Sequence, residues 1–261
     1  MSDAHAVPSP AARVIETSAL GRWATWFNTE VADFWLAHVH PRWRLNRLLA
    51  RVGERRQVAA DAVSLVLRVP RRWLLAKAGQ HVDVTVDIDG IRHTRSYSLS
   101  APPCDLRHIE ITVAKVEGGT VSGYLVDHLR PGDALQISAP YGGLRLPDDT
   151  SAPLLLLAAG SGITPLRALL LEALGRGWRG PITLGYWAQR GQSVCFAEQW
   201  AALEAEHPGL RVHTFLTRDP IAPAARINAE ALRQLAPVMP NAKCSLVAPP
   251  ALSIWRGPGL R

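Results

Sequence analysis

Hydrophobic and polar residues alternate along much of the segment from residue 51 to about residue 146, which is the period of half-buried β-strands. The alternation is clearest at 64–69, 81–88, 108–113 and 135–138. Asp89-Gly90 is a favoured two-residue hairpin turn, and it predicts that strand 81–88 returns as a strand ending near Ser100. A helix is expected near 121–129. Several short strands at close spacing predict a small antiparallel barrel.

The pattern changes after residues 147–153, a polar segment with proline at both ends. Residues 154–159 form a continuous apolar run, which is typical of a parallel strand buried on both faces. Alternating strands and helices follow. The expected strands are 182–188, 210–217 and 245–248, and the expected helices are 165–174, 196–206 and 228–235. This order predicts that the barrel is followed in the chain by an α/β part with a doubly wound parallel sheet.

The N-terminal 50 residues follow neither pattern. Residues 1–13 are expected to be a loose tail. Between residues 20 and 39 hydrophobic residues recur at helical spacing, which predicts an amphipathic helix ending before Pro41. Four of the nine tryptophans lie between positions 23 and 43. A helix packed on its own domain and a helix that docks on a partner or a membrane surface both fit this pattern.

Composition excludes several classes of protein. Hydrophobic residues make up 48% of the chain and charged residues 20%, which fits a packed core and not a disordered chain. The longest strongly apolar run, 154–159, is far shorter than the roughly 18–20 residues that cross a bilayer. No signal-peptide pattern begins the chain, so a cytoplasmic location is expected. Cys104, Cys195 and Cys244 lack metal-ligand spacing, so no metal site or iron–sulfur cluster is expected.

The positive charge is concentrated in one segment. Between residues 42 and 72 there are nine basic residues and two acidic ones, which accounts for the whole net charge of +7. Such a segment attracts an acidic partner or a membrane surface. An ordinary solvated face is the favoured interpretation, and nucleic acid is not expected as a partner.

Three short motifs carry candidate chemistry. Arg95-Ser96-Tyr97-Ser98 offers a cation, an aromatic ring and two hydroxyls, and Arg95 and Tyr97 point to the same face of a strand. These groups suit a ligand with a phosphate, a flat ring and polar edges. The second motif, Gly118-Gly119-Thr120-Val121-Ser122, stands at the expected start of a helix, and Thr120 or Ser122 is expected to cap that helix. Free backbone N–H groups at a helix start bind anions. Each motif alone also fits an ordinary exposed strand or a capped helix.

The third motif, Gly160-Ser161-Gly162-Ile163-Thr164-Pro165, directly follows the buried strand and opens a helix. This is the position of a dinucleotide phosphate loop. It is not the G-x-G-x-x-G fingerprint, because Pro165 stands at the third glycine position. A phosphate-cleaving P-loop is excluded, because no Lys-Ser/Thr pair follows.

Together and in this order, the three motifs resemble the ferredoxin–NADP reductase family of flavoproteins over roughly residues 51–248. The resemblance implies an antiparallel FAD-binding barrel at 51–148 and an NAD(P)-binding α/β domain at 149–261, after an N-terminal extension at 1–50. It implies electron flow from NAD(P)H through FAD to a separate ferredoxin-like, oxygenase or desaturase acceptor. The extension looks most like that of bacterial reductases serving membrane desaturases or oxygenases, with peripheral contact at the inner membrane face.

The resemblance also assigns residues to the flavin. Arg95 would bind the FAD phosphates, Tyr97 would stack on the isoalloxazine ring and Ser98 would bond near its N5 atom, with Ser96 between them as a further cofactor-binding residue. Further FAD contacts would come from two segments, Thr112, Val113 and Lys115 on the ribityl and adenine side, and Gly119, Thr120, Val121 and Ser122 at the pyrophosphate. Gly118 is a further cofactor-binding residue next to the second segment.

The nicotinamide nucleotide would bind Gly160, Gly162 and Thr164, and Ser98 and Thr164 are the candidate catalytic residues. Arg190 follows strand 182–188, where it would meet the 2′-phosphate of NADP, which favours NADPH over NADH.

One segment departs from the family pattern. Where the family has Cys-Gly-Pro after its last nucleotide-binding strand, this chain has Val247-Ala248-Pro249-Pro250, and the remaining residues do not predict the usual final helix and strand. The chain is therefore expected to be shortened at its C-terminus, with impaired nicotinamide turnover. A flavin-binding interaction protein with little or no turnover is the alternative. An ordinary dinucleotide dehydrogenase is disfavoured by the barrel and by Pro165.

Overall fold

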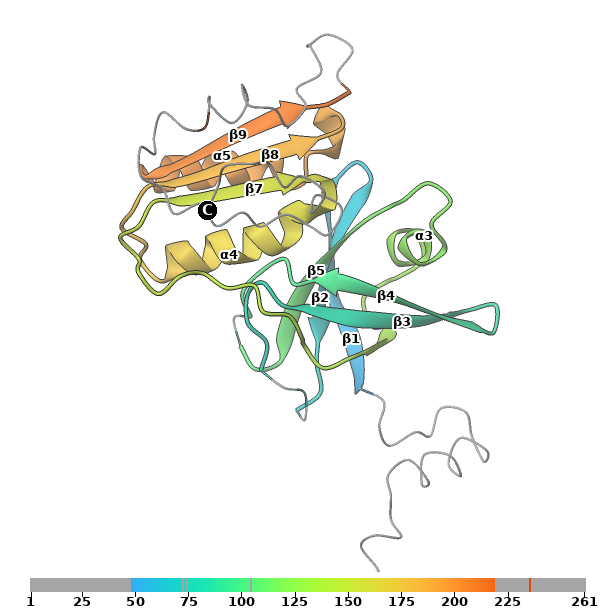
Figure 1. Ribbon diagram of the computed structural model, residues 1–261. Helices are drawn as coiled ribbons and strands as arrows, with labels where there is room; N and C mark the ends of the chain where they lie inside the picture. Colours follow the sequence, from blue (N-terminus) through green and yellow to red (C-terminus); the bar gives the residue numbers. More distant parts are fainter. Residues whose placement is uncertain (1–47, 72, 74, 104, 219–234, 236–261) are drawn as a thin grey trace, which may run out of the picture. The chain divides into compact units, whose positions relative to one another are not determined.

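The structure is a computed structural model, and it describes residues 48–71, 73, 75–103, 105–218 and 235. These residues form two sheets of different kinds, an antiparallel sheet followed by a parallel one (Figure 1). The antiparallel sheet has six strands in the order β4-β3-β6-β1-β2-β5. They are β1 (Leu48–Ala59), β2 (Ala62–Arg68), β3 (His81–Ile88), β4 (Ile91–Ser98), β5 (His108–Ala114) and β6 (Ala134–Ile137).

The antiparallel sheet closes on itself like a barrel. An isolated bridge between Leu99 and Ile111 joins the end of β4 to β5, and β4 and β5 are the two edge strands. Val82, Val84 and Val86 alternate into the core along β3, while the residues between them are partly exposed. The helix α3 (Thr120–Asp127) packs Val121, Leu125 and Val126 onto the same core. The antiparallel barrel predicted from the alternation is confirmed.

The β3–β4 hairpin turns where the sequence predicts. Ile88 pairs with Ile91, and the two residues between them, Asp89 and Gly90, have φ angles of 52° and 77°. Two successive positive φ angles are typical of a type I′ turn, whose twist fits two adjoining strands. The resulting register pairs His81 with Ser98 at the other end of the hairpin. It thereby brings residues at the start of β3 to the residues of β4 that carry the first motif.

The parallel sheet has the described order β7-β8-β9. Its strands are β7 (Leu154–Ala159), β8 (Ile182–Ala188) and β9 (Leu210–Leu216), joined by α4 (Ile163–Gly175) and α5 (Ala197–Glu206). Every residue of β8 is buried, as expected for a strand between two parallel neighbours. Alternate residues of β7 and β8 form one core with both helices, so α4 and α5 cover the same face of the sheet. The predicted α/β architecture is confirmed in these elements.

The helix α4 begins two residues earlier than the sequence predicts. A short 3₁₀ turn, Gly160–Gly162, runs directly into the helix at Ile163, so Pro165 is its third residue and not its first. The first N–H groups of a helix have no intrahelical acceptor, so a proline at this position removes no helical hydrogen bond. The early start places Thr164 and Pro165 in the first turn of the helix.

Several expected elements lie outside the described residues. These are the N-terminal helix, most of the helix at 228–235, the strand at 245–248 and the Val247–Pro250 segment. Peripheral membrane contact and a cytoplasmic location therefore stay predictions. Within the described residues, no helix is long and apolar enough to cross a membrane.

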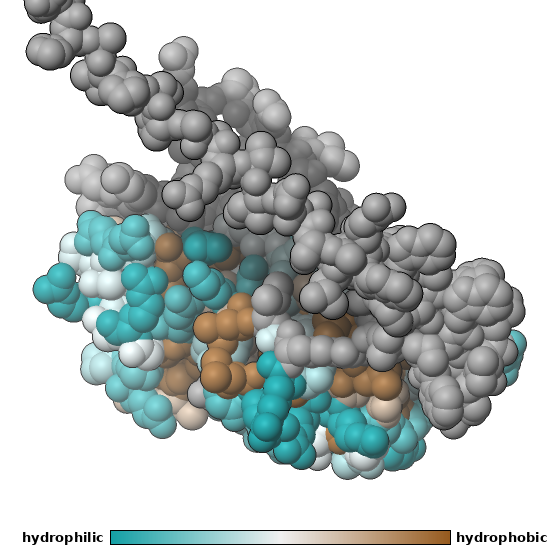
Figure 2. All heavy atoms as spheres, turned by 90° about the horizontal axis from the view of Figure 1, so that it is seen from below, coloured by the Kyte–Doolittle hydropathy of each residue, from teal (hydrophilic) through white to brown (hydrophobic). Residues whose placement is uncertain are grey.

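The described surface is mainly hydrophilic in the view of Figure 2, with hydrophobic residues exposed between the polar ones. The large exposed hydrophobic side chains include Leu49, Leu75, Ile91, Leu106 and Val116. Scattered exposed apolar residues are normal on folded proteins. Val116 is different from the others, because it lines the cavity described below.

Candidate active site

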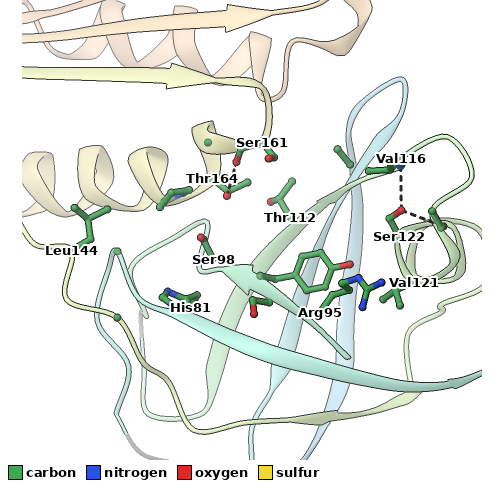
Figure 3. A pocket seen from close by; sticks show the side chains of 18 of the residues that line it. His81, Arg95, Ser98, Thr112, Val116, Val121, Ser122, Leu144, Ser161 and Thr164 are labelled. Atoms are coloured by element: carbon green, nitrogen blue, oxygen red, sulfur yellow. Dashed lines mark hydrogen bonds between the residues drawn. The ribbon is translucent and has the colours of Figure 1, made fainter. Parts of the chain in front are cut away.

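A cavity of about 570 Å³ lies between the two sheets, within the range of small-molecule and cofactor sites. Figure 3 shows Arg95, Ser98 and Thr112 on its antiparallel-sheet side and Ser161 and Thr164 on the side of α4. All three motifs found in the sequence reach it. The lining residues are Gly79, His81, Arg95, Ser96, Tyr97, Ser98, Thr112, Ala114, Val116, Gly119, Thr120, Val121, Ser122, Gly142, Gly143, Leu144, Ser161, Gly162, Thr164 and Pro165.

The last four residues of β4 line the cavity as one continuous strand. Ser96 Oγ donates a hydrogen bond of 2.6 Å to Asp83 Oδ1, and the Tyr141 hydroxyl donates to the same oxygen. Both bonds stabilise the charged carboxylate, so the pKa of Asp83 is lowered from its ordinary value. The hydrogen bond to Asp83 in turn raises the pKa of Tyr141. This polar cluster fixes Ser96 at the cavity wall.

Tyr97 combines exposure to the cavity with packing on the barrel core. Burial raises the pKa of its hydroxyl to about 12, because the phenolate loses hydration. Tyr97 is therefore neutral over the physiological range. A neutral, half-buried ring on a rigid strand is suited to pack against a flat aromatic ligand.

The start of α3 leaves backbone N–H groups free of a side-chain cap. Gly119 is the N-cap residue, and no side-chain hydrogen bond caps the helix. The sequence-based expectation that Thr120 or Ser122 would cap is therefore wrong. Ser122 Oγ accepts a hydrogen bond of 3.1 Å from Val116 N–H and donates one of 3.3 Å to the Gly119 carbonyl (Figure 3). These bonds close the turn before the helix.

The electrostatics of this wall suit an anion. Arg95 lines the cavity, and no carboxylate is among the described residues that line it. Its Nη1 donates to the Thr94 carbonyl at 2.7 Å, which leaves most of its guanidinium donors for a ligand. A cation and an uncapped helix N-terminus on one cavity fit a dinucleotide pyrophosphate. Gly143 adds open space at the wall, because a Cβ atom there would meet nothing within 4 Å. The residues present therefore fit FAD.

The opposite wall is the turn between β7 and α4. Ser161, Gly162, Thr164 and Pro165 line the cavity there. Thr164 Oγ1 donates a hydrogen bond of 2.9 Å to the Ser161 carbonyl, which holds the turn against the helix (Figure 3). The turn lies at the carboxyl end of a parallel strand, where α/β sheets bind nucleotides.

Five of the predicted binding residues do not line the cavity. Val113 is buried in the barrel core, and Lys115 Nζ pairs with Asp127 Oδ2 at 2.7 Å. Gly118 and Gly160 sit in turns with φ angles of 70° and 52°, next to residues that do line it. Arg190 is exposed beyond the end of β8. Their roles as ligand contacts stay predictions.

Sequence reasoning missed a further wall made by Gly79, His81 and the loop 142–144. His81 and Tyr141 exchange backbone hydrogen bonds of 2.8 and 2.9 Å, so this loop runs beside the start of β3. A Cβ atom on Gly79 would lie 2.4 Å from the Leu144 carbonyl oxygen, which shows how closely the two segments approach. The Gly142-Gly143 pair was a visible signal for such an approach.

Two family models match the chain in succession. The oxidoreductase FAD-binding domain matches residues 49–146, and the oxidoreductase NAD-binding domain matches residues 156–251. The two matches follow the antiparallel and parallel sheets in the order that the motifs predicted.

Curated relatives are similar to large parts of the chain. An NADPH oxidoreductase of Mycobacterium tuberculosis is 31% identical over 192 residues, which are 71% of this chain and 50% of that protein. The ferredoxin–NAD(P)⁺ reductase component of the naphthalene 1,2-dioxygenase system of Pseudomonas putida is 34% identical over 129 residues, 49% of this chain and 39% of that protein. The chain thus spans about half or less of the length of these relatives.

Among solved structures, the cytochrome P450 reductase of Amycolatopsis is similar, with a TM-score of 0.66 and 28% sequence identity. The similarity covers 79% of this chain and 62% of that chain. The shared fold, the two successive domain matches and the cavity between the sheets point to one conclusion. The chain belongs to the ferredoxin–NADP reductase family of FAD- and NAD(P)-binding oxidoreductases.

Proposed function

We propose that the chain takes electrons from NAD(P)H through FAD and passes them to a separate one-electron acceptor. The observation that carries this proposal is a single cavity whose walls are the β4 strand on one side and the turn before α4 on the other. A flavin ring held at Tyr97 and Ser98 and a nicotinamide held at Gly162 and Thr164 would meet in that space. The first wall is a regular strand, and the second is a turn that a hydrogen bond from Thr164 to the Ser161 carbonyl holds against the first turn of α4.

The residues of the antiparallel sheet bind and orient the flavin. Arg95 and the free N–H groups at the start of α3 bind the pyrophosphate, and Tyr97 packs on the ring. Ser98 contributes a hydroxyl at the end of β4, where it donates to the ring edge. Thr112 contributes a second hydroxyl from β5, the strand bridged to the end of β4. The bound FAD supplies the exchange between two-electron hydride chemistry and single-electron transfer.

The turn before α4 holds the nicotinamide nucleotide. Gly162 lets the backbone approach the nucleotide closely, and Thr164 orients the nicotinamide toward Ser98. In each turnover NAD(P)H gives up a hydride and becomes NAD(P)⁺, two electrons leave singly to the acceptor, and one proton is released to solvent. No side-chain general base is required, because the transferred hydrogen leaves carbon as hydride.

The acceptor is proposed to be a separate iron–sulfur protein or an oxygenase component. The naphthalene dioxygenase reductase in the comparison is the reductase component of such a system. The sequence has three cysteines, Cys104, Cys195 and Cys244, which are too few to hold a four-cysteine iron–sulfur cluster. The described residues hold no group of three or more potential metal ligands.

We further propose that NADPH is preferred over NADH. Arg190 and Arg218 are exposed and follow the ends of the neighbouring strands β8 and β9. The backbone N–H of Arg218 donates a hydrogen bond of 2.8 Å to the Gln189 carbonyl oxygen, which keeps the two strand ends together. Two guanidinium groups at adjacent carboxyl ends of parallel strands suit a 2′-phosphate.

The test is an absorption spectrum of the purified chain followed by anaerobic addition of NADPH or NADH. We expect flavin bands that bleach with NADPH and recover when ferricyanide, a one-electron acceptor, is added. Reduction of the flavin by light with a sacrificial donor is the control, because it does not need the nicotinamide site. Iron analysis should find no stoichiometric iron.

Three outcomes would contradict the proposal in different ways. Absence of flavin bands after reconstitution with FAD would remove the flavin assignment. Flavin that photoreduces but never bleaches with NADPH or NADH would support the alternative, a flavin-binding interaction protein with little turnover. One or more bound irons per chain would contradict the separate acceptor.

A further inference from the structure

A buried ion pair connects the antiparallel sheet with the helix α4. Arg167 lies on α4 and Glu110 on β5, and both are buried, with exposed fractions of 5% and 9%. Arg167 Nη1 donates a hydrogen bond of 3.0 Å to Glu110 Oε1. The pair therefore connects the helix that follows the nucleotide turn with a strand of the flavin-side barrel.

Arg167 is held by contacts on both sides of this junction. Its Nη1 also donates to the Ser100 carbonyl at 2.6 Å, just beyond the end of β4. On its own side, Nε donates to Gln199 Oε1 at 2.7 Å, and the guanidinium lies 4.2 Å from the centre of the Phe196 ring. These contacts fix the guanidinium plane, so the side chain has little freedom to follow a relative shift of the two sheets.

Glu110 gathers four donors. Besides Arg167, its carboxylate accepts hydrogen bonds from Ser64 at 3.0 Å and Ser100 at 3.3 Å on Oε1, and from Arg56 at 3.0 Å on Oε2. Buried charges are retained in folded proteins where they are paired and fully hydrogen-bonded, as here. The carboxylate is therefore a fixed point of the barrel wall.

The network reaches the cavity from both directions. Thr112 lines the cavity, and its Oγ1 donates to Ser100 Oγ at 2.9 Å and lies 2.6 Å from Ser64 Oγ. On α4, Thr164 lines the opposite wall one helical turn before Arg167. Hydrogen bonds through Ser64 and Ser100 thus connect the ion pair with Thr112, and neither Arg167 nor Glu110 is among the residues that line the cavity.

We propose that Arg167 and Glu110 are positioning residues that set the distance between the nicotinamide-binding turn and the flavin-binding strands. This inference rests on the proposed function. A buried ion pair gives little net stability compared with apolar residues of the same size, so stability alone does not account for it. Positional precision does, because an error of about 1 Å between two reacting groups can slow a transfer by about 100-fold.

The test compares Arg167→Gln, Glu110→Gln and the double variant with the parent protein. A single variant leaves one buried charge without its partner and can fail to fold for that reason. The double variant leaves neither partner of the pair charged, so it can still be measured in that case. Arg176→Gln is the matched control, because Arg176 adjoins the same helix and pairs at 3.8 Å with Glu172 inside the α/β part. Each protein is loaded with FAD, and its affinity for FAD and its rate of photoreduction are measured first.

Stopped-flow reduction by NADPH then gives the hydride-transfer rate and its dependence on NADPH concentration. We expect the Arg167 and Glu110 variants to transfer hydride about tenfold to a hundredfold more slowly, with FAD affinity, photoreduction and the NADPH dissociation constant within about threefold of the parent. The kinetic isotope effect on flavin reduction, measured with deuterated NADPH, should be no smaller in these variants than in the parent protein. The double variant should be no slower than the slower single one, because both substitutions break the same contact.

Amide hydrogen exchange supplies a readout that does not depend on activity. In the Arg167 and Glu110 variants we expect amide exchange to become faster both at residues 99–101 and in the first turn of α4. In Arg176→Gln we expect no change in either segment. Variants that match the parent in hydride transfer would overturn the inference and leave the proposed function standing. Additive losses in the double variant would also overturn it. A parent protein that NADPH does not reduce would overturn the proposed function and this inference with it.

Discussion

Ser122 Oγ accepts a hydrogen bond from Val116 N–H across the turn that precedes α3, and both residues line the cavity. The hydroxyl therefore holds the turn closed and leaves the first N–H groups of the helix without a side-chain cap. A cap would satisfy those donors internally and weaken their attraction for an anion. The predicted anion site thus depends on a serine whose hydroxyl bonds to Val116 N–H and the Gly119 carbonyl and leaves the first helix N–H groups free.

Ser122→Ala should lower the stability of the protein and its affinity for FAD together. The substitution removes one hydrogen bond and leaves the Val116 N–H without its partner, which costs about 1–2 kcal/mol. Urea unfolding and flavin titration measure the two effects. Thr120→Ala is the control, because Thr120 lines the same cavity without a role in closing the turn. Equal losses in the two variants would contradict the role given to Ser122.

Arg95→Gln should weaken FAD binding by about tenfold to a hundredfold. Charge-assisted hydrogen bonds to a phosphate contribute about 1.5–3 kcal/mol, which corresponds to this range. Arg92→Gln is the matched control on the same strand, because Arg92 Nη2 donates to Gln136 Oε1 and does not line the cavity. Unchanged FAD affinity in Arg95→Gln would remove Arg95 from the site.

The local motifs of this site could be read from the sequence, because each depends on neighbouring residues. Asp89-Gly90 fixes the register that pairs His81 with Ser98, and the turn before α4 follows directly from the apolar strand. The direction of the Ser122 hydroxyl could not be predicted in the same way. A serine near a helix start has two local partners, the helix N–H groups and the preceding turn, and the sequence does not choose between them.

Contacts between distant segments were beyond the sequence pattern. The wall formed by His81 and the loop 142–144 depends on a bridge between His81 and Tyr141, which no local periodicity encodes. The same holds for Arg167 and Glu110, which read as an ordinary helix arginine and strand glutamate in sequence. Lys115 shows the opposite case, because a basic residue near a phosphate motif forms an ion pair with Asp127 in the structure.

Arg190→Gln and Arg218→Gln should each raise the KM for NADPH by about tenfold and leave the KM for NADH nearly unchanged. A hydrogen-bonded pair with the 2′-phosphate is available only to NADPH, and solvent exposure keeps its contribution near the low end of charge-assisted bonds. Arg211→Gln, near the opposite end of β9, is the control. Parallel changes in the two KM values would contradict a 2′-phosphate role.

Asp83 should make stability depend on acid pH. Hydrogen bonds from Ser96 and Tyr141 lower its folded-state pKa below the ordinary value of 3.8, so the carboxylate stabilises the fold above that value. The contribution is lost as the pH falls through the folded-state pKa. Asp83→Asn should therefore be less stable than the parent at neutral pH, and the difference should shrink below pH about 4. Urea unfolding across this range measures it.

Tyr141→Phe provides the graded comparison for Asp83. It removes one of the two side-chain donors that lower the pKa of Asp83 and keeps the ring that packs on His81. The acid-dependent part of the stability should shrink in this variant without disappearing. A stability difference between Asp83→Asn and the parent that stays constant from neutral pH to pH about 3 would show that the carboxylate charge does not stabilise the fold.

Gly142→Ala should be the more damaging of two neighbouring glycine substitutions. Gly142 has a φ of 108°, and a Cβ atom there would lie 2.7 Å from the His81 ring. The ring cannot move away freely, because it packs edge-on against Tyr141 with 3.9 Å between the ring centres. Backbone strain and overlap together should cost about 1–3 kcal/mol.

Gly143→Ala separates this effect from a general sensitivity of the loop. A Cβ atom at Gly143 would meet nothing within 4 Å, and its φ lies outside the left-handed region, so the expected loss of stability is below about 0.5 kcal/mol. His81 lines the cavity, so its displacement in Gly142→Ala should also weaken FAD binding. Thermal unfolding and flavin titration of both variants test the pair. Equal stability of the two variants would mean that the His81 ring yields to the added methyl group and that this wall of the cavity is not rigid.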